Sequence, residues 1–156
     1  MDAISVPHTS LEMVLRLLLA TGLGAAVGVN RELRLKPAGL RTHALVGLGA
    51  SLLTFIALMM APTLPMDFNP VSRVVQGLVA GIGFIGGGAI LRTDDSQGVQ
   101  GLSTAASIWV VSAVGIAAGF GLWRAALTAS VLALGILALG APVDRRLRSW
   151  RERGED

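Results

Sequence analysis

The sequence predicts an all-α integral membrane protein with five transmembrane helices, and three observations support this fold class. Of the 156 residues, 53% are hydrophobic and only 15% are charged, and the mean hydropathy is +0.66. Soluble domains carry roughly 25% charged residues. Twenty residues are glycine and 4% are aromatic, a composition typical of closely packed transmembrane helices. Five stretches are also long enough to cross a bilayer, which takes about 20 residues. These features exclude a water-soluble enzyme, and we expect neither catalysis nor a cofactor.

The first two spans are delimited by charged residues and by proline. The first runs from Leu11 to Asn30. It includes Arg16, and Glu12 stands four residues earlier, where the two side chains share one helix face. The second span runs from Ala44 to Ala61 and is closed by Pro62, because proline cannot continue a helix.

The other three spans follow in close succession. They run from Val74 to Leu91, from Gly101 to Leu122 and from Ala125 to Val143. We therefore expect an N-terminal tail over residues 1–10, a five-helix domain over residues 11–143 and a basic tail over residues 144–156.

The positive residues predict how these spans are oriented. Four of the thirteen Lys and Arg residues lie between Arg31 and Arg41, and five lie between Arg145 and Arg153. Lys and Arg in short loops are retained on the cytoplasmic side. We therefore predict an external N-terminus, a cytoplasmic C-terminus and a multi-pass protein of the bacterial inner membrane. A nucleic-acid partner is excluded, because the sequence has no aromatic-interleaved basic face or docking motif.

Two stretches of the sequence are similar to each other. Gly22, Gly24 and Gly28 have the same spacing as Gly81, Gly83 and Gly87, which lie 59 residues later. Each set is followed by a polar loop and a Gly-Leu-x-Thr-x-Ala segment, at residues 39–44 and 101–106. The similarity is either chance in a glycine-rich chain or a parallel internal repeat of helices 1–2 and 3–4. A true repeat would place the two Gly-Leu-x-Thr segments opposite each other.

The glycines of the third span have more than one interpretation. Residues 81–86 match the dinucleotide pattern G-x-G-x-x-G, but that pattern binds phosphate only at a strand-to-helix turn. Close helix packing is the more common role of such glycines, and local unwinding that exposes carbonyl groups to an ion is the alternative. Because lipid fills such grooves poorly, we expect a homodimer or small homo-oligomer. The candidate packing residues are Gly24, Gly28, Gly77, Gly81, Gly83, Gly87, Gly115 and Gly119.

The loop over residues 31–43 is the richest polar stretch. It is either a topology signal in which Thr42 caps the next helix, or an anion or carboxylate receptor built from Arg41 and His43 at a helix N-terminus. On the second interpretation we expect Arg41 to contact Glu32, Asp94 or a bound anion. A metal site stays unknown. His43 lacks a second ligand at zinc spacing, and aspartates in a loop are usually solvated although carboxylates suit Mg²⁺.

Four blocks of the sequence together resemble the MgtC/SapB family. They lie at residues 38–50, at Arg73 and Gln76, at residues 81–88 and at residues 101–109. The resemblance implies a bacterial inner-membrane protein linked to growth in low magnesium and, in some pathogens, to virulence through survival inside macrophages. For the best-known member it implies inhibition of the F-type ATP synthase through membrane contacts. It also implies a soluble C-terminal domain, whereas this chain stops soon after the fifth span, so roles of that domain are in doubt.

The residues that carry the resemblance and the polar residues of the loop together define a candidate functional polar cluster. Its members are Arg31, Glu32, Arg41, Thr42, His43, Arg73, Gln76, Asp94, Ser103 and Thr104, with Trp109 beside them. Two functions remain open. The first is a non-enzymatic regulatory protein that contacts the lipid bilayer, a second copy or another membrane protein such as ATP synthase. The second is a small oligomeric channel or transporter for Mg²⁺ or another ion.

Overall fold

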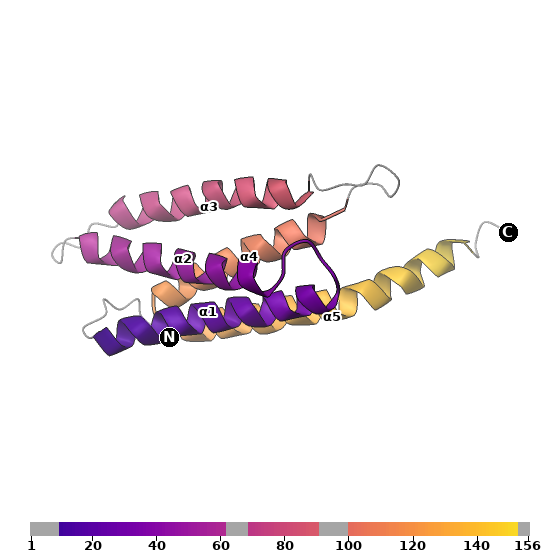
Figure 1. Ribbon diagram of the computed structural model, residues 1–156, viewed down its shortest axis with the longest axis horizontal. Coiled ribbons are helices and arrows are strands. Elements are labelled where there is room, and N and C mark those ends of the chain that lie inside the picture. Colours follow the sequence, from indigo (N-terminus) through magenta and orange to yellow (C-terminus); the bar gives the residue numbers. More distant parts are fainter. Residues whose placement is uncertain (1–9, 62–68, 91–99, 153–156) are drawn as a thin grey trace.

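The computed structural model describes residues 10–61, 69–90 and 100–152, and this part of the chain consists of five α-helices without a strand (Figure 1). All five helices are long and apolar enough to span a membrane. The all-α, five-span prediction is therefore confirmed, and each predicted span coincides with one helix to within a few residues at most ends. The helices are α1 (Ser10–Leu33), α2 (Leu40–Met60), α3 (Asn69–Ile90), α4 (Leu102–Gly119) and α5 (Trp123–Glu152).

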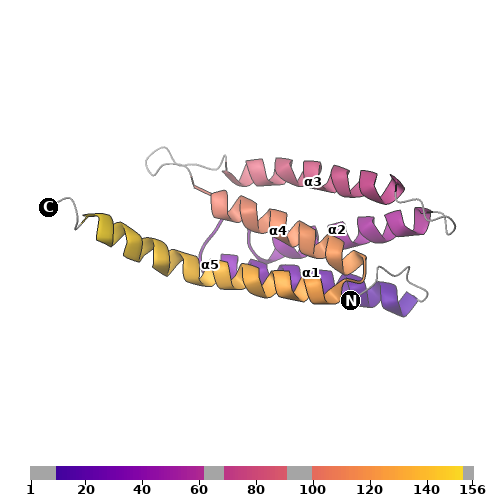
Figure 2. The ribbon, with the colours of Figure 1, turned by 180° about the vertical axis from the view of Figure 1, so that it is seen from behind.

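Helices α2 and α4 form the centre of the bundle. They contact each other, α1 packs against both, and α3 packs against both from another side, while α5 covers α1 and α4 (Figures 1 and 2). Half of the apolar span of α4 is buried, against 11% of the spans of α3 and α5. These contacts match an internal two-fold repeat in which α1 corresponds to α3 and α2 corresponds to α4. In such a repeat, α1 packs against α2 as α3 packs against α4, and α1 packs against α4 as α3 packs against α2.

Small residues let the central helices touch through their backbones. A Cβ atom added to Gly115 of α4 would lie 2.6 Å from the carbonyl oxygen of Gly47 and 2.8 Å from the Cβ atom of Ala50 on α2. A Cβ atom added to Gly28 of α1 would lie 2.7 Å from the Cα atom of Leu40. Such contacts leave no room for a larger side chain, so glycine fixes the distance of α2 from α1 and α4.

The α1–α2 loop starts with a tight turn that reverses the chain. The amide of Lys36 donates to the Arg31 carbonyl, and the amide of Leu35 donates to the Glu32 carbonyl. This pair of bonds is the Schellman motif, which needs a left-handed residue after the helix. Leu35 has that conformation, with φ of 53°, although glycine is the usual residue there.

The fifth helix is longer than its apolar span. We predicted that the span would end at Val143, but α5 continues as a helix to Glu152 although its apolar window ends at Gly140. Of the nine residues from Asp144 to Glu152, six are Arg, Leu or Glu, which favour helix whether or not lipid surrounds them. Figures 1 and 2 show that this last part projects beyond the other four helices.

Candidate functional site

The candidate site lies at the end of the bundle where α1 ends and α2 and α4 begin. We call it the basic end, because the α1–α2 loop there carries the exposed residues Arg34 and Lys36, followed by Arg41 in the first turn of α2. Five polar residues meet at this end between α1, α2 and α4, and we call them the α4 polar cluster. They are Arg31, His43, Ser103, Thr104 and Ser107.

Arg31 is a buried cation that joins α1 to the first turn of α4. Only 2% of its surface is exposed. Its Nη2 atom donates to the Thr104 hydroxyl at 2.7 Å and to the Ser103 hydroxyl at 3.0 Å, while its Nε atom has no partner among the described residues. Both acceptors are neutral hydroxyls. Within the described part of the chain, the guanidinium therefore forms hydrogen bonds but no ion pair.

His43 joins α2 to the same stretch of α4. It is fully buried, with Nδ1 2.9 Å from the Gly39 carbonyl oxygen and Nε2 2.9 Å from the Ser107 hydroxyl. A carbonyl oxygen only accepts, so Nδ1 carries hydrogen. Ser107 also lies within donating distance of the Thr104 carbonyl, at 2.7 Å, so its one hydroxyl hydrogen has two acceptors when the imidazole is neutral. The ring is thus held at both nitrogens.

Glu32 caps α2 from the end of α1. Its carboxylate accepts from the amide of Leu40 at 2.8 Å, which places a negative charge at the positive end of the helix. Gly39 is the residue before the helix, and a Cβ atom there would collide with this carboxylate. Thr42 makes no capping bond, so the expectation that Thr42 caps α2 is wrong. The carboxylate reaches the free amide from the preceding helix instead.

The structure does not show the contact that we expected between Arg41 and Glu32. Arg41 is exposed, and no ion pair joins it to Glu32 in the described part of the chain. The cation between the two helix starts is Arg31. The close contact at Gly28 brings the last turns of α1 against the start of α2, and Arg31 itself bonds to Thr104 in the first turn of α4. Asp94, the other expected partner, lies outside the described residues.

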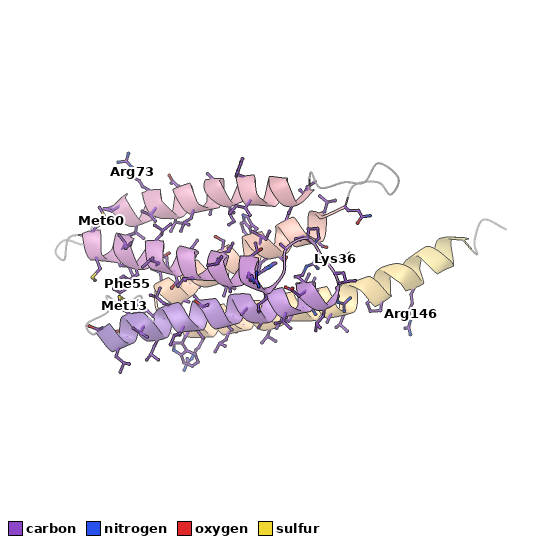
Figure 3. The ribbon with its side chains drawn as sticks, in the orientation of Figure 1. Met13, Lys36, Phe55, Met60, Arg73 and Arg146 are labelled. Carbon is purple, nitrogen blue, oxygen red and sulfur yellow. The ribbon has the colours of Figure 1, made fainter. Side chains whose placement is uncertain are left out.

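Three further predicted residues lie away from the cluster. Arg73 and Gln76 are exposed in the first two turns of α3, at the opposite end of the bundle, and Figure 3 shows Arg73 pointing away from the helices. Trp109 is 52% exposed on α4. The contacts of the described chain therefore bring only Arg31, His43, Ser103 and Thr104 together, with Glu32 next to them.

The eight predicted packing glycines fall into two groups. A Cβ atom added to Gly24, Gly28, Gly115 or Gly119 would collide with α2. A Cβ atom added to Gly77, Gly81, Gly83 or Gly87 on α3 would meet nothing within 4 Å. The first group thus packs inside this chain, whereas the second faces away from the described residues.

Comparison with known proteins settles the family. The MgtC family matches residues 17–146, which is most of the chain. The chain belongs to the MgtC family. The predicted relationship is thereby confirmed, and the family region includes α2, α3, α4 and the whole α4 polar cluster. No solved structure matches the chain.

Three curated relatives of this family align with most of the chain. YhiD of Escherichia coli K12, named "Putative magnesium transporter YhiD", is 40% identical over 130 residues, which are 81% of this chain and 59% of YhiD. SrpB of Synechococcus elongatus is 37% identical over 142 residues, 86% of this chain and 78% of SrpB. MgtC of Salmonella typhimurium LT2 is 38% identical over 121 residues, 78% of this chain and 49% of MgtC. The chain thus spans about half to three fifths of YhiD and MgtC.

Two bonded residues are absent from the candidate cluster predicted from the sequence: Ser107, within the family region, and Arg16, just before it. Ser107 holds His43, and its position four residues after Ser103 places both on one helix face, which was the available signal. Arg16 is 5% exposed and donates to the carbonyl oxygen of Gly119 at 2.8 Å, beside its partner Glu12. The Glu12–Arg16 pair was predicted, but nothing in the sequence indicated that it would reach α4.

Proposed function

We propose that this chain is a non-enzymatic regulatory protein of the bacterial inner membrane that acts through helix–helix contacts during adaptation to low magnesium. The outward face of α3 carries this proposal. Five glycines on α3 have open space beside them, namely Gly77, Gly81, Gly83, Gly87 and Gly88. Phe84, which lies among them, is 87% exposed. Glycine faces of this kind let another helix approach closely.

The electrostatics of the basic end favour regulation over cation transport. Arg31 stands against the first turn of α4, where the helix N-terminus is itself positive, and its described partners are neutral hydroxyls. A divalent cation that moved between α1, α2 and α4 would be repelled by both positive groups. A magnesium path through the α4 polar cluster is therefore unfavourable.

The first partner that we propose for the α3 face is a second copy of this chain. A homodimer or small oligomer would cover the glycines and Phe84. A further membrane protein, such as the F-type ATP synthase that the family resemblance implies, is the next partner to test.

Transport is the second candidate function, and two observations favour it. One relative carries the name of a magnesium transporter. In addition, the hydroxyl oxygens of Ser51 on α2 and Ser112 on α4 are buried and have no partner among the described residues, and buried polar groups without partners are rare unless they serve a function.

Reconstituted protein separates the two functions. We expect proteoliposomes loaded with a magnesium-sensitive dye to take up Mg²⁺ no faster than empty liposomes. Uptake that is lost in the Ser51→Ala and Ser112→Ala variants would establish transport instead. In parallel, inverted membrane vesicles that contain the protein should show slower ATP-driven proton pumping than vesicles without it.

The same vesicles test the α3 face. Gly83→Leu fills that face and should restore proton pumping, whereas Gly135→Leu should not, because Gly135 also has open space but lies on α5. Equal effects of the two variants would contradict a role for α3.

A further inference from the structure

The C-terminal part of α5 extends beyond the segment of this helix that is apolar enough to span a membrane. The apolar window of α5 ends at Gly140, but the helix continues to Glu152. At about 1.5 Å per residue, this extension is about 18 Å long. It leaves the bundle at the basic end, on the same side as Lys36, and Figure 3 shows Arg146 directed away from the other helices.

A proline marks the point at which this extension begins. Pro142 lies inside α5 and has no amide hydrogen, so the carbonyl of Ala138 loses the partner that a continuous helix would give it. Arg34, in the α1–α2 loop, donates from Nη2 to this carbonyl oxygen at 3.0 Å. The loop thus satisfies the α5 backbone at the position where proline weakens the helix, and proline is the usual cause of a bend.

The sequence of the extension is that of a basic amphipathic helix. Val143, Leu147 and Trp150 recur at intervals of four and three residues, a spacing that places them on one helix face. Four arginines occupy other positions between residues 145 and 151, against two acidic residues, Asp144 and Glu152. Helices with arginines around a stripe of Leu, Val and Trp lie flat in the membrane interface.

We propose that residues 143–152 form a surface helix that turns at Pro142 and binds the phosphate groups of anionic phospholipids. The position follows from the fold, because the extension continues a membrane-spanning helix and so begins at the headgroup level. The charge is complementary, since Arg34, Lys36 and Arg41 are exposed at the same end and anionic lipids attract such juxtamembrane clusters. Trp150 suits the interface, where its amphipathic ring is favoured.

A single cysteine reports on this helix, because the chain has none. The Ser149→Cys variant of the full chain is labelled with a fluorophore and placed in nanodiscs of phosphatidylcholine, with or without phosphatidylglycerol. Quenching by acrylamide, which is uncharged, measures exposure of the label to water. We expect clear protection in discs with phosphatidylglycerol and weak protection in neutral discs. Equal quenching in the two lipids would overturn the proposal.

Matched variants test whether the protection of the label from quenching depends on the arginine charges and on the bend at Pro142. Arg146→Gln and Arg151→Gln should each lower the ratio of bound to free helix about fivefold, whereas Arg73→Gln, at the opposite end, should leave it unchanged. Pro142→Ala restores the backbone bond to Ala138 and should keep the label exposed in both lipids. Protection that survives Pro142→Ala would contradict the bend. Protection that inorganic phosphate produces in neutral discs would contradict the lipid as the source of phosphate.

Discussion

Arg16 and Arg31 attach α1 to opposite ends of α4. Arg16 donates to the carbonyl of Gly119, the last residue of α4, and Arg31 donates to Thr104 in its first turn. The two arginines are fifteen residues apart on α1, and their partners are fifteen residues apart on α4. At about 1.5 Å per residue, both separations are about 22 Å. The antiparallel helices are therefore held in one register at both ends.

Arg31→Ala should destabilise the bundle more than Arg41→Ala. The first change removes two hydrogen bonds from a charged, buried donor, each of which contributes about 1.5–3 kcal/mol, and leaves the Thr104 hydroxyl without its donor. Arg41 is exposed, so its removal should cost less than about 0.5 kcal/mol. Thermal unfolding in one detergent measures both variants. Equal melting temperatures would show that the buried cation does not hold α4.

The two anchors of α1 should act independently. Arg16 and Arg31 lie about 22 Å apart along the helix. Arg16 donates to Gly119 of α4, whereas Arg31 donates to Ser103 and Thr104 at its other end. The effects of Arg16→Ala and Arg31→Ala on the free energy of unfolding should add to within about 0.5 kcal/mol. A double-mutant cycle measures this sum. A much smaller cost in the double variant would mean that α4 is already released by either change.

Leu35→Gly should stabilise the protein by about 1 kcal/mol. Leu35 is held at φ of 53°, which is unfavourable for a residue with a Cβ atom, and its side chain is 93% exposed, so little packing is lost. Leu33→Gly is the control, because it lies in the last turn of α1 and should be destabilising in the helical conformation. If both variants lower the unfolding temperature, the turn does not carry the strain that its φ angle implies.

Glycines on α4 and on α3 should respond differently to alanine. Gly115→Ala should cost about 1–3 kcal/mol through overpacking, because the new methyl group meets the Gly47 backbone. Gly81→Ala enters open space and should not destabilise the monomer. Gly83→Leu should reduce the oligomer mass in nanodiscs without unfolding the monomer, whereas Leu78→Ile should leave the mass unchanged. Unaltered mass in Gly83→Leu and Gly87→Leu would exclude the α3 face as the contact between copies.

The orientation in the membrane stays a prediction from the positive residues. A reporter fused after Asp156 should read cytoplasmic, and one inserted between residues 62 and 72 should read external. The opposite pair of readings would place the basic end outside.

The sequence by itself determined the number and type of the helices, because the need of apolar segments to avoid water depends on local composition and length. It also indicated the family, because four motif blocks occur in a fixed order. On the repeat interpretation, it also predicted that the two Gly-Leu-x-Thr helix starts lie opposite each other, and the candidate cluster accordingly included His43, Ser103 and Thr104.

Only the tertiary structure decided which charge occupies the space between those helix starts. Arg31 and Arg41 are equally charged and both border a helix, but the contact at Gly28 turns Arg31 toward Thr104 while Arg41 remains exposed. The attachment of Arg16 to Gly119 and of Arg34 to Ala138 joins residues more than 100 positions apart. Such bonds depend on the register and rotation of whole helices, which are set by the backbone contacts at glycine rather than by the local pattern around each arginine.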